Sequence, residues 1–165
     1  MVWNSTHRDV HLQAIGYDVI WERTVDDATA MKQHASSSRV FEPVTLGYCD
    51  LFGSAFDHCV DGADRAAHGS MPFVKWYLHK VCAHEQQTDV RCVDYLDLHF
   101  YRHGCGIIYC NVPPADSESA GIAVRRLAAL KELHDPRWIS PSWIVDPGNN
   151  ALFHYARAHL IRPAR

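Results

Sequence analysis

Residues 93–101 constrain the fold more than any other stretch, because a strand made of them would have little polar surface. The run reads VDYLDLHFY, and its apolar members are Val93, Tyr95, Leu96, Leu98 and Phe100. Such a run is typical of a parallel strand that is buried on both faces. The sequence therefore predicts a parallel strand here, with neighbours that cover it.

Helical and strand patterns alternate around this run. Apolar residues recur at helical spacing over residues 18–35, 72–87 and 119–133. Residues 39–46 have strand composition, and Pro43 within them marks an end or a bulge. This alternation predicts an α/β fold with parallel strands. Two strands cannot close a barrel, so the fold predicted is part of a larger one.

The segment between the first strand (residues 39–46) and the second helix (residues 72–87), residues 47–70, is expected to be a long loop. Its carboxylates Asp57, Asp61 and Asp64 could supply oxygen ligands to calcium, but a solvated acidic loop is the preferred explanation. We therefore predict no metal site and no cofactor. Asp18 is expected to cap the first helix.

Composition narrows the function classes. The chain has 165 residues, 47% of them hydrophobic and 21% charged, which suits one globular domain. A net charge of −3 gives no electrostatic case for binding nucleic acid or an anionic membrane. No apolar run is long enough to span a bilayer, and residues 1–8 lack the features of a signal peptide. The sequence does not specify an oligomeric state.

Six cysteines are present, and none forms a Cys-x-x-Cys pair. Cys49 and Cys59 flank a short loop and could close a disulfide there. For Cys82, Cys92 and Cys110 we expect buried or free thiols.

Several motifs resemble glycoside hydrolase family 44 in order and spacing. The most specific are WNSTHRDVH at residues 3–11 and DYLDLHFY at residues 94–101, and EPVTLGY at residues 42–48 supports them. The resemblance covers residues 1–144. Residues 145–165 look unrelated to the family, so we predict a catalytic-domain fragment at 1–144 and a divergent C-terminal tail at 145–165.

The resemblance implies a (β/α)₈ TIM barrel, here a partial barrel lacking the first and last strands. It also implies a secreted parent enzyme that cleaves β-glucans such as cellulose and xyloglucan with retention of configuration. That reaction needs two carboxyl groups roughly 5 Å apart. The family's two glutamates lie in Asn-Glu-Pro and Thr-Glu-Tyr motifs, and neither motif occurs in this chain. We therefore assign no catalytic residue and expect the chain to be inactive by itself.

Five residues are predicted from the resemblance to bind the polysaccharide. Trp3 and Asn4 follow the position of the missing acid/base glutamate, and Tyr48 stands where the family has an aromatic platform for sugars. His99 and Tyr101 end the strand of residues 93–101, at the end of an α/β barrel that faces the active site. For Trp3 the alternative is an ordinary packed side chain, and for His99 a half-buried histidine bonded to the backbone.

Two other functional hypotheses remain open. The chain is either a non-catalytic glucan-binding remnant, with Trp3, Tyr48 and Tyr101 as stacking platforms, or a gene fragment without function.

Overall fold

The computed structural model describes residues 14–45, 47–58, 61–99, 120–135 and 137–138. The chain divides into two compact units, Met1–His99 and Phe100–Arg165. In the first unit the elements are, in order, α1 (Tyr17–His34), β1 (Phe41–Thr45), the 3₁₀ helix η2 (Tyr48–Leu51), β2 (Asp57–His58), β3 (Asp61–Gly62), α2 (Ala63–Ala67), α3 (Phe73–Thr88) and β4 (Tyr95–Leu98). The second unit contains α4 (Ala120–Ala128) and the 3₁₀ helix η3 (Ala129–Leu133).

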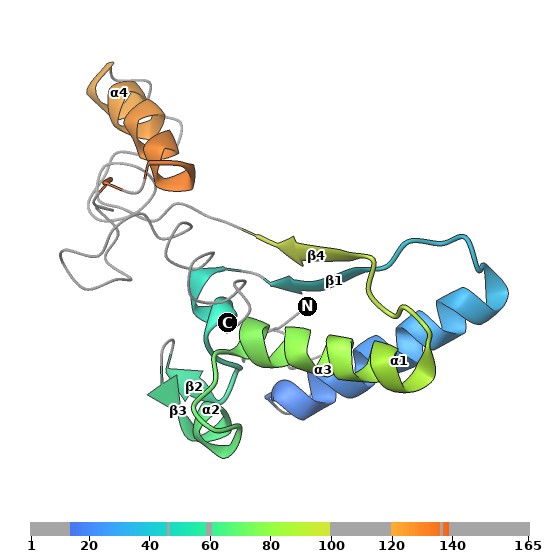
Figure 1. Ribbon diagram of the computed structural model, residues 1–165. Coiled ribbons are helices and arrows are strands. Elements are labelled where there is room, and N and C mark those ends of the chain that lie inside the picture. The colour runs from blue at the N-terminus through green and yellow to red at the C-terminus, as the bar shows by residue number, and fades with distance from the viewer. Residues whose placement is uncertain (1–13, 46, 59–60, 100–119, 136, 139–165) are drawn as a thin grey trace. The chain divides into compact units, whose positions relative to one another are not determined.

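The first unit is built on a pair of parallel strands. β1 and β4 pair in register from Phe41 opposite Tyr95 to Thr45 opposite Leu98. Both α1 and α3 lie on one side of this pair (Figure 1). The predicted α/β class and the predicted parallel pairing are thus confirmed for this unit.

The register of the strand pair shifts between Pro43 and Thr45. This confirms the irregularity predicted at Pro43. Val44, which lies inside the bulge, has a φ of 51°. A β-branched residue rarely adopts this left-handed conformation, so the bulge is imposed by its surroundings and not by local preference.

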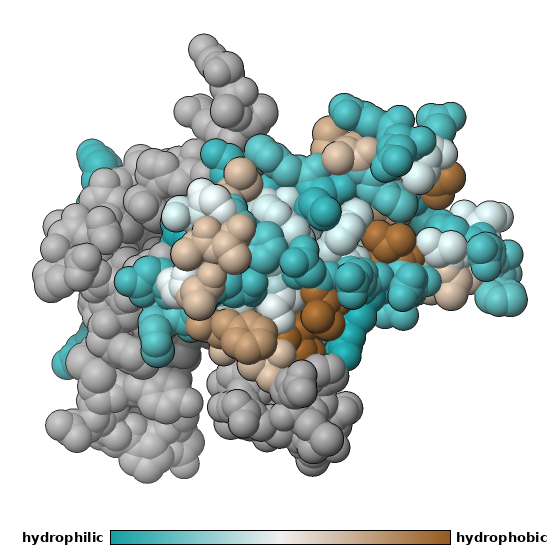
Figure 2. Space-filling view, turned by 90° about the horizontal axis from the view of Figure 1, so that it is seen from below, coloured by the Kyte–Doolittle hydropathy of each residue, from teal (hydrophilic) through white to brown (hydrophobic). Residues whose placement is uncertain are grey.

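The core lies between the two helices and the sheet. Its fully buried side chains include Tyr17 from α1 and Phe73, Val74 and Tyr77 from α3. The Tyr77 hydroxyl donates to Thr24 Oγ1 of α1 at 3.1 Å, so these two buried hydroxyl groups are paired. The solvent side of the helical layer is mostly hydrophilic, with small hydrophobic patches (Figure 2).

The long helices begin and end close to the predicted residues, but the predicted cap of α1 is wrong. Gly16 occupies the N-cap position without a side-chain hydrogen bond, and Asp18 lies in the first turn. The carboxylate of Asp18 instead contacts His68, 50 residues away in sequence. Pro72 precedes α3, and Asp89 ends it with a left-handed φ of 55°.

The prediction that the second strand is covered on both faces is wrong for the described residues. Phe41 and Tyr95 stack on each other with ring centroids 4.7 Å apart, and each is 52% exposed. The reason is that α1 and α3 cover only one face, and no other described element of the unit packs over this aromatic pair.

The predicted loop at residues 47–70 contains short regular elements. β2 and β3 form an antiparallel hairpin, in which Asp57 is opposite Gly62, and α2 follows directly. These elements stand at one end of the helical layer (Figure 1).

In the second unit, the predicted helix of residues 119–133 is present as α4 followed by η3. Ile122 and Ala129 are buried within this unit, whereas Val124 and Leu127 are 65% and 67% exposed. Across the described part of the chain, no helix combines the length and the apolar character that crossing a membrane requires. The predicted boundary at residue 144 lies outside the described residues and stays a prediction.

Candidate functional site

The carboxyl ends of β1 and β4 meet at one edge of the sheet. The backbone N–H of His99 donates to the carbonyl oxygen of Thr45 at 3.2 Å, which fixes the two chain ends side by side. Thr45 is fully buried, and within the described part of the chain its hydroxyl oxygen has no hydrogen-bonding partner. The Nδ1 atom of His99 is also buried. In α/β sheets, ligands bind at this carboxyl edge.

The structure places two of the five predicted substrate-binding residues near this edge. His99 follows β4 directly and is half-buried. Tyr48 begins η2, three residues after Thr45, but only its backbone is described. Trp3, Asn4 and Tyr101 lie outside the described residues. The substrate-binding role of all five stays a prediction.

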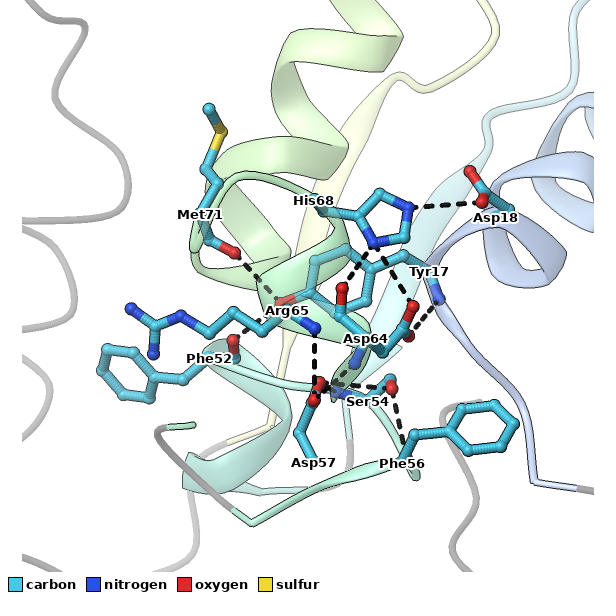
Figure 3. A network of polar contacts seen from close by, with 10 residues as sticks. All are labelled: Tyr17, Asp18, Phe52, Ser54, Phe56, Asp57, Asp64, Arg65, His68 and Met71. Atoms are coloured by element: carbon cyan, nitrogen blue, oxygen red, sulfur yellow. Dashed lines mark hydrogen bonds and ion pairs between the residues drawn. The ribbon is translucent and has the colours of Figure 1, made fainter. Parts of the chain in front are cut away.

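A polar network shapes the segment that follows β1, residues 47–72, which we name the clasp loop (Figure 3). Asp57 organises its interior. Asp57 Oδ1 accepts the backbone N–H groups of Asp64 and Arg65, each at 3.1 Å, and Oδ2 accepts the N–H of Ser54 at 2.8 Å. A carboxylate that accepts three backbone hydrogen bonds holds the hairpin and α2 together.

The start of α1 ties down both ends of the clasp loop. The carbonyl oxygens of Phe52 and Met71 both accept from the buried Tyr17 hydroxyl, at 2.8 Å and 3.1 Å respectively, and share its single proton. The backbone N–H of Tyr17 donates to Asp64 Oδ2 at 2.9 Å. Burial, followed by the negative charge of Asp57, raises the pKa of Tyr17, so its hydroxyl stays protonated as a donor.

His68 completes this network. Its Nδ1 lies 2.7 Å from the carbonyl oxygen of Asp64, and its Nε2 lies 3.2 Å from Asp18 Oδ2 (Figure 3). The imidazole stacks on Tyr17 with centroids 4.7 Å apart and meets Trp76 edge-on at 4.9 Å. Sequence analysis did not identify this cluster, because its members are distant in sequence and no local pattern links them.

The acidic residues of the clasp loop have structural roles. Asp57 and Asp64 accept backbone hydrogen bonds, and Asp61 lies in β3. Among the described residues, no group of three or more His, Cys, Asp or Glu side chains is placed to hold a metal ion. The Asp57 and Asp64 carboxylates thus stabilise the fold of this loop.

Cys49, at the start of the clasp loop, is disulfide-bonded. Cys82 and Cys92 are free thiols, exposed and buried respectively, as predicted. The partner of Cys49 therefore lies outside the described residues, as does the predicted partner Cys59. Cys110 also lies outside them.

Glu42 lies in β1, one of the two parallel strands. Burial raises the pKa of its carboxyl group, and the charges of Asp27 and Asp97 raise it further. Its charge also acts on the buried hydroxyl of Tyr77 in α3. A carboxyl group with a raised pKa is suited to proton donation. Glu42 pairs with Leu96 in the middle of the strands, away from the carboxyl edge, so we assign it no catalytic role.

Comparison with known proteins identifies relatives of this arrangement. Residues 1–104 match the family model described as glycoside hydrolase family 44. The chain is 28% identical over 142 residues to the β-mannanase/endoglucanase A of Caldicellulosiruptor saccharolyticus, an alignment that covers 83% of this chain and 10% of the relative.

Solved structures show the same fold. CelM2, a bifunctional glucanase-xylanase from a metagenome library, superposes with a TM-score of 0.79 at 23% identity, covering 96% of this chain and 31% of CelM2. A family 44 xyloglucanase from Paenibacillus polymyxa, solved with xyloglucan, superposes with a TM-score of 0.68 at 26% identity, covering 87% of this chain and 27% of that enzyme. The chain thus spans less than a third of the length of each of these relatives.

Proposed function

The chain belongs to glycoside hydrolase family 44, and we propose that it forms part of the glucan-binding catalytic domain of a retaining endo-β-glucanase. The observation that carries the proposal is the family match over residues 1–104. That stretch includes all five residues predicted to bind substrate, Trp3, Asn4, Tyr48, His99 and Tyr101. We propose β-glucans such as cellulose and xyloglucan as the substrate class.

The carboxyl edge of β1 and β4 supports this role. The polar residues Thr45 and His99 lie at the edge, and Tyr48 follows Thr45 by three residues in the sequence. Hydroxyl and imidazole groups can bond to sugar hydroxyls, and aromatic rings stack on the apolar face of a pyranose. We propose that His99 bonds to the glucan and that Tyr48, Tyr101 and Trp3 stack on it, with Asn4 as a polar contact.

Hydrolysis requires groups that this chain does not encode. The retaining reaction uses one carboxyl group to protonate the leaving oxygen and a second to attack the anomeric carbon. Neither an Asn-Glu-Pro nor a Thr-Glu-Tyr motif occurs in the sequence. We propose that the chain is a partial (β/α)₈ barrel with no hydrolytic activity of its own, and that the activity belongs to a polypeptide that supplies both glutamates.

We also propose that the parent enzyme works outside the cell. Its proposed substrates are polymers, and Cys49 is disulfide-bonded, a state that persists in oxidising compartments.

Glucan binding is tested by affinity electrophoresis of the purified chain in native gels with and without xyloglucan. We expect xyloglucan to retard the chain. Tyr101→Ala and His99→Ala are expected to weaken binding about 3- to 10-fold, the range of one stacking or polar contact. Tyr95→Ala is the matched control, because Tyr95 lies at the opposite end of the same strand. Equal mobility with and without xyloglucan would contradict the proposal.

Hydrolysis is tested separately by reducing-sugar release from carboxymethylcellulose and xyloglucan. We expect no release above a heat-treated sample, because a missing catalytic carboxylate costs several orders of magnitude in rate. Sustained release that follows the concentration of the chain would refute the proposed inactivity and return Glu42 and the aspartates to consideration.

A further inference from the structure

The clasp loop connects the proposed glucan-binding edge to the helical layer. It begins two residues after Thr45, carries Tyr48 in its first turn, and ends at Pro72, before α3. Its interior is braced by Asp57, which holds Ser54, Asp64 and Arg65 through backbone hydrogen bonds. With these internal bonds in place, the position of the loop depends on where it is attached to the rest of the unit.

The attachment is concentrated at the first residues of α1. Besides the bonds of Tyr17 to Phe52, Met71 and Asp64, the N–H of Ala55 donates to the carbonyl oxygen of Ile15 at 3.3 Å. A further contact pairs His68 with Asp18, two ionisable side chains from opposite sides of the junction. This contact changes with the protonation of His68.

Both ring nitrogens of His68 face acceptors. Nδ1 faces the carbonyl oxygen of Asp64, with Asp64 Oδ1 also 3.2 Å away, and Nε2 faces the Asp18 carboxylate. A neutral imidazole carries one proton and can donate only one of these bonds, whereas the imidazolium donates both. The geometry is therefore complementary to the protonated ring.

The two charged groups beside the ring both favour the protonated state. α1 contributes the Asp18 carboxylate and the neutral phenol of Tyr17, α2 contributes Asp64, and α3 contributes the uncharged indole of Trp76. Burial lowers the pKa of His68, but the hydrogen bonds to Asp64 and Asp18 and the charges of both aspartates outweigh it, so the net shift is upward. A histidine with a raised pKa in the folded state stabilises the fold fully below about pH 6.5, its unfolded value, and loses that contribution as the pH rises through the folded pKa.

We propose that His68 is a positioning residue that fastens the clasp loop to the start of α1 when protonated, and so makes glucan binding at the Tyr48 edge tighter at mildly acidic than at mildly alkaline pH. The expected effect on glucan binding rests on the proposed function. The attachment of the loop by His68 is independent of the proposed function.

Hydrogen exchange measured by mass spectrometry tests the fastening directly. Wild type and His68→Gln are compared at the same pH, so that the intrinsic pH dependence of exchange cancels. At pH 5.5 we expect peptides from residues 50–72 to exchange about two- to fivefold faster in His68→Gln, the effect of one partly exposed ion pair. At pH 8 we expect a smaller difference between the two proteins, because the stabilising contribution of His68 is lost as the pH rises through its folded pKa.

Two further variants make the experiment decisive. His79→Gln changes an exposed histidine of α3 and should match wild type at both pH values. Asp18→Asn removes the partner of Nε2 and should reproduce most of the His68→Gln effect. The Asp18 side chain is 67% exposed, so we expect this variant to fold, and it tests the proposal even if His68→Gln does not fold. Equal exchange of the loop in wild type and Asp18→Asn at pH 5.5 would overturn the proposal.

Affinity electrophoresis in xyloglucan at the same two pH values supplies the functional readout. We expect stronger retardation of wild type at pH 5.5 than at pH 8, a weak and pH-independent retardation of His68→Gln, and wild-type behaviour of His79→Gln. Retardation of wild type that does not change with pH would overturn the link between His68 and the glucan. Protection of the loop by His68 without any retardation would instead reject the proposed function and leave the fastening intact.

Discussion

At the scale of single residues, Asp94 is the strongest electrostatic junction described in the first unit. Its side chain is 3% exposed and accepts from Lys32 Nζ at 2.7 Å, Arg39 Nη1 at 3.0 Å and the backbone N–H of Val40 at 2.9 Å. The hydrogen bond from Lys32, followed by that from Val40, holds the pKa of Asp94 far below its ordinary value. One carboxylate thus joins the end of α1 to the starts of β1 and β4.

We expect Asp94→Asn to lower the urea midpoint of unfolding at pH 7, followed by tryptophan fluorescence from Trp21 and Trp76. A carboxyl group whose pKa is depressed in the folded state stabilises above its unfolded pKa of about 4 and loses that contribution as the pH falls further. The difference between variant and wild type should therefore narrow below pH 4. Asp26→Asn, an exposed position on α1, is the control. An undiminished difference at pH 3 would contradict this reading.

The residue scale is also where sequence reasoning fails most clearly. Asp18 has the sequence context of a helix cap, yet its partner is His68. Residue type and local spacing cannot distinguish the two roles, because the choice depends on a loop that returns from 50 residues away. The same holds for Asp57 and Asp64, whose carboxylates fit a metal site or a solvated loop in sequence but bind backbone amides in the structure.

At the scale of secondary structure elements, α3 ends at a residue in an unfavourable conformation. Asp89 has a φ of 55° and donates its N–H to the carbonyl oxygen of Glu85 at 2.9 Å, the position that glycine usually occupies at a helix end. The left-handed conformation is costly for a residue with a Cβ, and a carboxylate here also opposes the helix dipole.

We expect Asp89→Gly to raise the free energy of unfolding by about 0.5–1 kcal/mol, because the relief of strain exceeds the added entropy of the unfolded chain. Asp89→Ala removes the same charge but keeps the Cβ, so it should give a smaller gain or none. Urea unfolding of the three proteins measures the difference. A larger gain from alanine than from glycine would show that charge, not conformation, limits this helix end.

Elements with their own amphipathic pattern were predictable, and elements that depend on distant partners were not. α1 and α3 lie within about a residue of the stretches predicted from apolar spacing, at residues 18–35 and 72–87. The hairpin of β2 and β3 was missed, because its two-residue strands have no pattern of their own. It is held by Asp57 and by the attachment of its loop to Tyr17, whose bonds span 35 and 54 residues of sequence.

At the scale of the whole molecule, the parallel pairing of β1 with β4 was predictable, whereas the extent of the sheet was not. The carboxyl edge with Thr45 and His99 follows from two parallel strands, and so the position of His99 could be anticipated. Sequence cannot say what lies beyond the two strands. In the described residues each of them pairs only with the other.

Unpaired edges beside exposed aromatic rings favour association between chains. Phe41 and Tyr95 form a stacked pair, and each residue is 52% exposed. In the partial barrel that we propose, the missing strands would cover this pair. We expect the exposed parts of these two residues to be a surface on which copies of the chain can meet.

We therefore expect Tyr95→Lys to reduce self-association of the isolated chain, measured by sedimentation velocity over a tenfold range of concentration. A lysine at the sheet face both removes the apolar ring and adds repulsion between copies. Val90→Lys is the matched control, since Val90 is also 52% exposed but lies in the connection before β4. If the two variants reduce association equally, general hydrophobicity is responsible. If only Tyr95→Lys does so, the open face of the strand pair is the surface that a complete barrel has to cover.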